Sequence, residues 1–169
     1  MNITLGLREI PNYIEGTACV PTAIAAITGL TPQQIAQAIA DAAPGSSKPA
    51  IVTADPTKPF DINHWVAAID LLGLKWHEGV GWHSILEDQR APIRYFLQNH
   101  VAADDDRRIL LMFAERRVAG KDPMTHVFAI QGNEIVDTST FGRKLALKDA
   151  AITDDFNEFR MKRIFEITQ

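Results

Sequence analysis

The chain has 169 residues, of which 46% are hydrophobic and 22% are charged, a balance typical of a globular protein with its own buried core. Its formal net charge of −4 offers no basic surface for nucleic acid, and it contains no run of about 18 apolar residues that would predict a membrane span. Because it has a single cysteine, an internal disulfide is excluded, and the fold does not depend on an oxidising compartment.

A chain of this length is expected to form one domain, which we take as residues 1–169. Its first residues, MNITLGLREIPNYIEG, lack the basic segment followed by an apolar segment that marks a signal peptide. We therefore expect a protein that is cytoplasmic at synthesis, and delivery into a host stays open.

The first predicted helix covers residues 19–28, where apolar side chains recur at i, i+4 and i+7 from Val20. Pro21 is tolerated only in a first helical turn, so the helix must begin close to Cys19. Gly29 stands where a helix C-terminal glycine is expected. The only thiol of the chain is therefore predicted at a helix N-terminus.

Three further helices are predicted. The second, 31–43, begins with a capping box of Thr31 and Gln34, and the third, 62–72, is capped by Asp61. The fourth is the short segment 91–101. Between the second and third lies the proline-rich loop 41–61, with one short strand expected at 51–52. Loops of this length are usually functional or disordered, so we expect either a lid over the site or a surface insertion.

After residue 107 the pattern changes from helices to strands. A weaker strand is expected earlier, at 74–80. The later strands are 108–115, 125–131, 134–140 and 160–168. The pair 125–131 and 134–140 flanks the turn dipeptide Gly132–Asn133, which is a hairpin signal. Helices first and an antiparallel sheet second predict an α+β fold.

The predicted hairpin places a histidine and a carboxylate side by side. If Gly132 and Asn133 form the turn, His126 faces Ser139, and Asp137 is its diagonal neighbour on the same face, at a Cα separation of roughly 7–8 Å. A carboxylate in that position can fix the orientation of the imidazole and stabilise its charged form.

Cys19 is the candidate nucleophile for this pair. The first turn of a helix carries unpaired N–H groups and the positive end of the helix dipole, which stabilise a thiolate. A neighbouring imidazolium stabilises it further, and the N–H groups can serve as oxyanion donors. Cys19, His126 and Asp137 are therefore predicted as nucleophile, general base and orienting carboxylate.

A cysteine that opens an early helix, followed by helices and by a sheet carrying HVFAIQGNEIVD, resembles the papain-like cysteine peptidases. The nearest resemblance is to compact bacterial and phage members of the C39-like and NlpC/P60-like groups. It implies a papain-like α+β fold and the same roles for Cys19, His126 and Asp137. It also implies an oxyanion side chain about six residues before the cysteine: an amide donor would favour Asn12, and a tyrosine, as in NlpC-like enzymes, would favour Tyr13.

The function implied is a cysteine hydrolase that cleaves a peptide or isopeptide bond through a thioester acyl-enzyme, with a polypeptide as its partner and no metal or organic cofactor. Two alternatives remain. One is a glutamine deamidase or transglutaminase-type effector with the same triad, and the other is a binding module that keeps the fold without catalysis. Trp82 and His83, in KWHEGVGWH, are candidates for a substrate groove, with half-exposed packing as the other interpretation. The remaining histidines have no metal-ligand spacing, so no zinc site is predicted.

Overall fold

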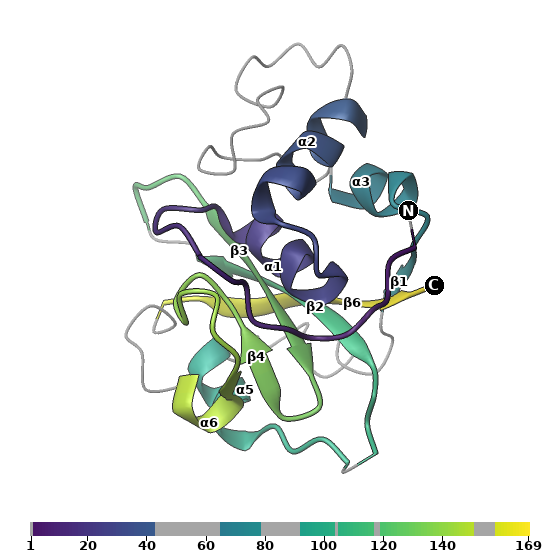
Figure 1. The fold of residues 1–169 in the computed structure, drawn as a ribbon. Coiled ribbons are helices and arrows are strands. Elements are labelled where there is room, and N and C mark those ends of the chain that lie inside the picture. Colours follow the sequence, from purple (N-terminus) through teal and green to yellow (C-terminus); the bar gives the residue numbers. More distant parts are fainter. Residues whose placement is uncertain (1, 43–64, 79–91, 104, 117–118, 151–157) are drawn as a thin grey trace.

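The computed structural model describes residues 2–42, 65–78, 92–103, 105–116, 119–150 and 158–169. Within these ranges it has an α+β fold, built on a six-stranded antiparallel sheet with the strand order β1-β6-β2-β3-β4-β5 (Figure 1). The strands are β1 (Lys75–Glu78), β2 (Ile109–Arg116), β3 (Met124–Gln131), β4 (Glu134–Val136), β5 (Leu145–Ala146) and β6 (Arg160–Thr168). The helices are α1 (Cys19–Thr28), α2 (Pro32–Ala42), α3 (Trp65–Leu71), α5 (Ile93–Asn99) and α6 (Leu147–Ala150).

The helix boundaries follow local signals in the sequence. Helix α1 begins at Cys19 and ends before Gly29, whose φ of 74° is the left-handed conformation that glycine adopts without strain. The capping box of α2 is confirmed: the Thr31 N–H donates to Oε1 of Gln34 at 2.8 Å, and the Gln34 N–H donates to Oγ1 of Thr31 at 3.2 Å. The third and fourth predicted helices correspond to α3 and α5.

The hairpin register is also confirmed, because Ala129 faces Val136 and Gln131 faces Glu134. The second strand is shorter than predicted, however. It ends at Val136, where the Asp137 N–H donates to Oγ1 of Thr140 at 3.1 Å instead of continuing the ladder. The expected pairing of His126 with Ser139 therefore does not form, and residues 137–143 make a compact turn.

The sheet buries a separate core on each face. Along β3, Val127 and Ala129 join the core that contains α1 and α2, whereas Phe128 and Ile130 join the core that contains α5 and α6. Because both faces of the central strands are buried, their sequences are almost continuously apolar. Figure 1 shows α1, α2 and α3 to one side of the strands and α5 and α6 to the other.

An extended N-terminal segment ties α1 to the hairpin. The N–H groups of Gly6 and Arg8 donate to the carbonyls of Ile27 and Ala26, at 3.0 and 2.8 Å, near the C-terminal end of α1. Further along, the Ile10 N–H donates to the Gly142 carbonyl at 2.9 Å. The chain just before Cys19 is thus fastened to the turn that follows Asp137.

Several predicted features lie outside the described residues. These are Trp82 and His83, Asp61, the short strand at 51–52, and the loop 41–61 from residue 43 onward. Of the helices that the described ranges contain, none has the length and apolar character needed to cross a membrane. The short elements β5 and α6 were not predicted.

Candidate active site

Cys19 is the first residue of α1, and its side chain is partly exposed. The preceding residue, Ala18, has an extended backbone and provides no side-chain cap. The Thr22 N–H donates to the Ala18 carbonyl at 3.2 Å, whereas the N–H groups of Cys19 and Val20 come too early in the helix to have an intrahelical acceptor. The thiol therefore lies at a helix end that favours negative charge.

His126, on β3, contacts both of the other predicted residues. Its Nε2 atom lies 3.0 Å from Oδ2 of Asp137 and 2.9 Å from Oδ1, and the Cys19 side chain is close enough to the ring to raise its pKa. Only 16% of the His126 side chain is exposed. Cys19, His126 and Asp137, which are separated by up to 118 positions in the chain (137 − 19), are thus brought together at one site.

The balance of charges favours the protonated imidazole. Burial by itself would lower the pKa of His126, but the charge of Asp137, the hydrogen bond to Asp137 and the interaction with Cys19 outweigh it. The pKa of His126 is consequently raised well above its usual value of 6.5. An imidazolium beside the Cys19 sulfur is the state that this environment stabilises at neutral pH.

Asp137 is fully buried and remains ionised because polar partners surround it. Burial would raise its pKa, yet the charge and hydrogen bond of His126, together with Ser139, lower it. The Ser139 hydroxyl donates to Oδ2 at 2.7 Å and its backbone N–H lies 3.3 Å from the same oxygen. The Thr140 hydroxyl donates to the Arg143 carbonyl at 2.6 Å, and this hydrogen bond closes the turn.

Aromatic rings border the imidazole. The ring of Phe128 stacks near His126 at a centroid distance of 6.1 Å, and that of Phe159 lies 5.5 Å away at a tilt of 56°. The guanidinium of Arg116 lies over Phe159, 5.6 Å from its centroid. Apolar rings next to the ion pair reduce its contact with water, which strengthens the attraction between His126 and Asp137.

The two candidate oxyanion residues differ in their surroundings. Tyr13 is half-buried, and burial raises the pKa of its hydroxyl. The charges of Asp137 and Cys19 raise this pKa further, whereas the interaction with Thr22 lowers it. Asn12 is exposed with a φ of 55°, and its side chain makes no hydrogen bond to the described residues. Tyr13 therefore lies close enough to Cys19 and Asp137 for their charges to act on its hydroxyl.

Gly142 makes room for Tyr13. A Cβ atom on this glycine would lie 2.8 Å from Cδ2 of the Tyr13 ring, so the ring packs directly against the backbone of the turn. Sequence reasoning missed this contact and missed the roles of Ser139 and Phe159. The letters DTST contain a usable signal, because serine or threonine shortly after aspartate commonly forms side-chain-to-backbone turns.

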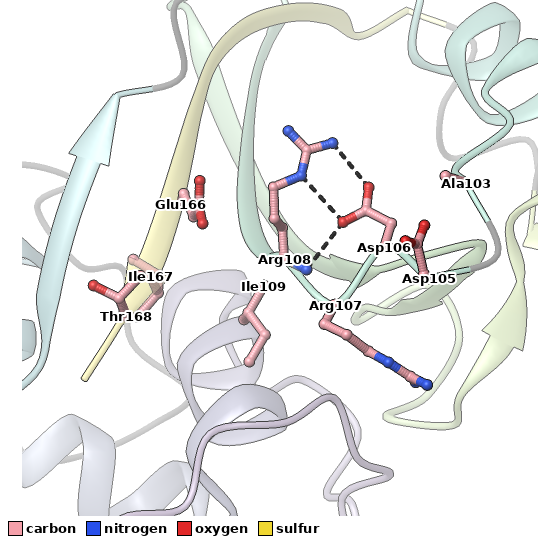
Figure 2. Close-up of a pocket in the computed structure, with 9 residues that line it drawn as sticks. All are labelled: Ala103, Asp105, Asp106, Arg107, Arg108, Ile109, Glu166, Ile167 and Thr168. Carbon is pink, nitrogen blue, oxygen red and sulfur yellow. Dashed lines mark hydrogen bonds and ion pairs between the residues drawn. The ribbon is translucent and has the colours of Figure 1, made fainter.

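A pocket of about 520 Å³ lies elsewhere, where β2 begins and β6 ends (Figure 2). Three of its charged side chains are paired: Arg108 donates to Asp106 at 3.1 and 2.8 Å, and Glu166 lies 3.0 Å from His77. Along β2, this end is five residues from Ala114, which faces His126, a distance of about 17 Å. The pocket is therefore separate from the Cys19 site.

No protein-family model matches the sequence, and a search of curated proteins finds no match. Among the residues that the structure describes, no three side chains of histidine, cysteine, aspartate or glutamate are grouped so that they could hold a metal ion. The geometry of Cys19, His126, Asp137 and Tyr13 is therefore what bears on the function of this protein.

Proposed function

We propose that this protein is a papain-like cysteine hydrolase that cleaves a peptide or isopeptide bond through a thioester at Cys19. The observation that carries the proposal is the His126 ring, which lies 2.9–3.0 Å from the buried Asp137 carboxylate and close enough to Cys19 for the thiol to raise its pKa. The order of these residues in the chain, and a cysteine-bearing helix packed on an antiparallel sheet that carries the histidine, support the papain-like assignment.

The ring orientation assigns a role to each nitrogen of His126. Nε2 contacts the Asp137 carboxylate, which leaves Nδ1 for the Cys19 sulfur. Because Asp137 holds the ring and favours its charged form, His126 is placed to accept the proton of the thiol at Nδ1 during the reaction. The resulting thiolate is a far stronger nucleophile than the thiol.

The reaction then proceeds in two steps. In the first, the Cys19 sulfur bonds to the substrate carbonyl carbon, the carbon–nitrogen bond breaks, and the imidazolium of His126 gives its proton to the leaving amine. In the second, His126 accepts a proton from water as the water oxygen bonds to the thioester carbon. The carbon–sulfur bond breaks, which releases the acid and restores the thiolate.

The oxyanion formed in both steps needs hydrogen-bond donors. The first-turn N–H of Cys19 is one candidate, since it has no intrahelical acceptor. The Tyr13 hydroxyl is the second: it is a phenol donor near Cys19, and in the structure it donates a long hydrogen bond of 3.5 Å to the Thr17 carbonyl, which it would exchange for the oxyanion. Pro21 has no N–H, so the helix N-terminus can contribute few donors of its own and a side-chain donor gains importance.

The direct test is the rate at which iodoacetamide alkylates Cys19, followed by intact-protein mass. At pH 7, His126→Ala should slow the reaction by roughly 10²-fold, because the thiolate loses its imidazolium partner. His77→Ala is the matched control, since His77 lies on β1 with its side chain 59% exposed and pairs with Glu166, remote from the thiol. Equal rates for wild type and His126→Ala would contradict the proposal.

The same preparation separates the hydrolase from its alternatives. Incubation with a mixture of denatured proteins should yield new peptide termini that are absent with Cys19→Ala. Conversion of glutamine side chains to glutamate, or their conjugation to amines, without new termini would instead indicate the deamidase or transglutaminase activity. If Cys19 is reactive but neither kind of product forms, the result would favour the third alternative, a binding module without catalysis.

A further inference from the structure

Exposed apolar side chains gather on the segments that build the Cys19 site. Large hydrophobic residues with more than a third of their surface exposed are few among the described residues; they are Ile14, Leu71, Trp76, Tyr95, Val101, Met124 and Phe141. Three of these lie within five positions of a proposed catalytic residue: Ile14 before Cys19, Met124 before His126, and Phe141 after Asp137. We refer to Ile14, Met124 and Phe141 as the apolar rim.

Ile14 and Phe141 belong to neighbouring backbone segments. Ile14 follows Tyr13, Phe141 precedes Gly142, and the Tyr13 ring packs directly on Gly142. The two side chains are 66% and 53% exposed. The Ile14 carbonyl accepts hydrogen bonds from the N–H and the hydroxyl of Thr17, at 3.2 and 2.6 Å, so the backbone that presents Ile14 is fixed.

Phe141 has a backbone conformation that a bulky residue rarely adopts. Its φ is 53°, in the left-handed region, and its N–H donates to the Thr138 carbonyl at 3.0 Å. An exposed ring adds little to the core, so packing does not explain why a phenylalanine occupies a position suited to glycine or asparagine. Strain of this kind is characteristic of sites that contact a ligand.

Met124 is the first residue of the strand that carries His126. It precedes His126 by two positions on β3 and therefore shares its face of the strand. The Arg116 side chain contacts the Met124 sulfur and also covers Phe159, the ring beside His126. Phe159 and Met124 are thus linked through the Arg116 side chain, and Met124 is 49% exposed.

We propose that the apolar rim binds an apolar side chain of a polypeptide substrate, next to the carbonyl that Cys19 attacks. This inference rests on the proposed hydrolase function. Ile14 and Phe141 adjoin Tyr13, and Met124 adjoins His126, so an extended chain presented to the thiol would pass between them. An acidic substrate residue is disfavoured at the Ile14 end of the rim, because Glu15 is exposed next to Ile14.

Two peptidyl fluoromethyl ketones test the proposal. They are identical except for the residue that supplies the reactive carbonyl, which is leucine in one and aspartate in the other. Each rate of Cys19 labelling is divided by the rate of alkylation with iodoacetamide, so that changes in thiol reactivity cancel. We expect the leucine probe to label wild-type protein at least about tenfold faster, as the burial of several methylene groups would give.

Phe141→Asn removes the ring while keeping a residue that tolerates positive φ. It should reduce the leucine preference by about fivefold or more and leave the thermal midpoint unchanged or higher. Leu71→Asn is the matched control, because Leu71 is 57% exposed at the end of α3, which packs on α2 and β1. It should leave the preference unchanged.

The outcomes are distinct. Rapid alkylation of Cys19 with equal labelling by both probes would overturn the apolar rim and leave the hydrolase proposal standing. If His126→Ala alkylates as fast as wild type, the hydrolase proposal fails and the rim proposal fails with it. If wild type is a dimer that Phe141→Asn separates, the rim is a self-association surface, and the proposal is overturned in favour of a second copy.

Discussion

Oδ2 of Asp137 accepts hydrogen bonds from both His126 and Ser139, at 3.0 and 2.7 Å, so a single oxygen joins the imidazole to the turn. The Ser139 hydroxyl is thus a positioning group: it acts on the carboxylate and, through it, on the ring. Because the carboxylate is fully buried, each donor matters more than it would at the surface.

Removal of that hydroxyl gives the first prediction. Ser139→Ala should raise the pKa of Asp137 towards its usual value of 3.8, because one of the groups that lowers it is lost. A carboxyl group whose pKa is lower in the folded protein than in the unfolded chain stabilises the fold at pH values above its unfolded-state pKa. This contribution is lost as pH falls through its folded-state pKa. The variant should therefore lose about 1.5–3 kcal/mol of unfolding free energy at pH 7, and less as pH drops.

Urea denaturation at a series of pH values, down to the lowest at which the protein folds, measures this effect. Ser139→Thr retains the hydroxyl and is the control, expected to stay within about 0.5 kcal/mol of wild type. A loss for Ser139→Ala that is the same at every pH would mean that Ser139 contributes packing alone and does not act on the charge of Asp137.

The turn of residues 137–143 is the element that links the hairpin to the segment before Cys19. Gly142, the second to last residue of the turn, has a φ of 68°. Its N–H donates to the Asp137 carbonyl at 3.0 Å, and its carbonyl accepts from the Ile10 N–H at 2.9 Å. The Tyr13 ring rests on this glycine. Displacement of the turn should therefore move the proposed oxyanion donor and the orienting carboxylate together.

Gly142→Ala tests this linkage. The added Cβ would lie 2.8 Å from the Tyr13 ring. The alanine would also have to adopt the left-handed backbone conformation that glycine has at this position. We expect a loss of about 2–4 kcal/mol in unfolding free energy, the sum of the backbone cost and overpacking. Gly73→Ala provides the control, because Gly73 has a φ of 72° with nothing within 4 Å of its Cβ position, so only the backbone cost of about 1–2 kcal/mol applies. Equal losses would show that the Tyr13 contact is not tight.

At the same scale, the sequence predicts those elements whose signals are local. Pro21 and Gly29 bound α1, and the Thr31–Gln34 capping box starts α2, so both helices could be predicted within one residue. The end of β4 could not. Threonine and serine in DTST suit a strand, but the Thr140 hydroxyl accepts the Asp137 N–H and ends the ladder.

Across the whole molecule, the site is formed where the two cores meet. Cys19 belongs to a helix that packs in one core, whereas His126 shares its strand face with Phe128 and Ile130 of the other. The turn dipeptide set the hairpin register, so the pairing of His126 with Asp137 could be predicted from the sequence. The contacts of the N-terminal segment with Gly142 and α1 could not, because they depend on long-range packing that leaves no local pattern.

The position of α1 on the sheet should therefore control the reactivity of Cys19 separately from overall stability. Ile24 in α1 and Ile39 in α2 are both fully buried in the same core. Replacing either by alanine should cost about 2–5 kcal/mol. Only α1, however, packs directly on β3, the strand that carries His126. A cavity under α1 lets the Cys19 end shift relative to the imidazole, whereas a cavity under α2 does not reach that contact.

We accordingly expect Ile24→Ala to slow alkylation of Cys19 at pH 7 by about tenfold, which corresponds to about 1.4 kcal/mol, while Ile39→Ala stays near the wild-type rate. The rates are compared at a temperature where both variants are fully folded by circular dichroism. If both variants slow alkylation in proportion to their loss of stability, the thiol reports unfolding of the whole domain. In that case the packing of α1 on β3 has no specific role in holding Cys19 against His126.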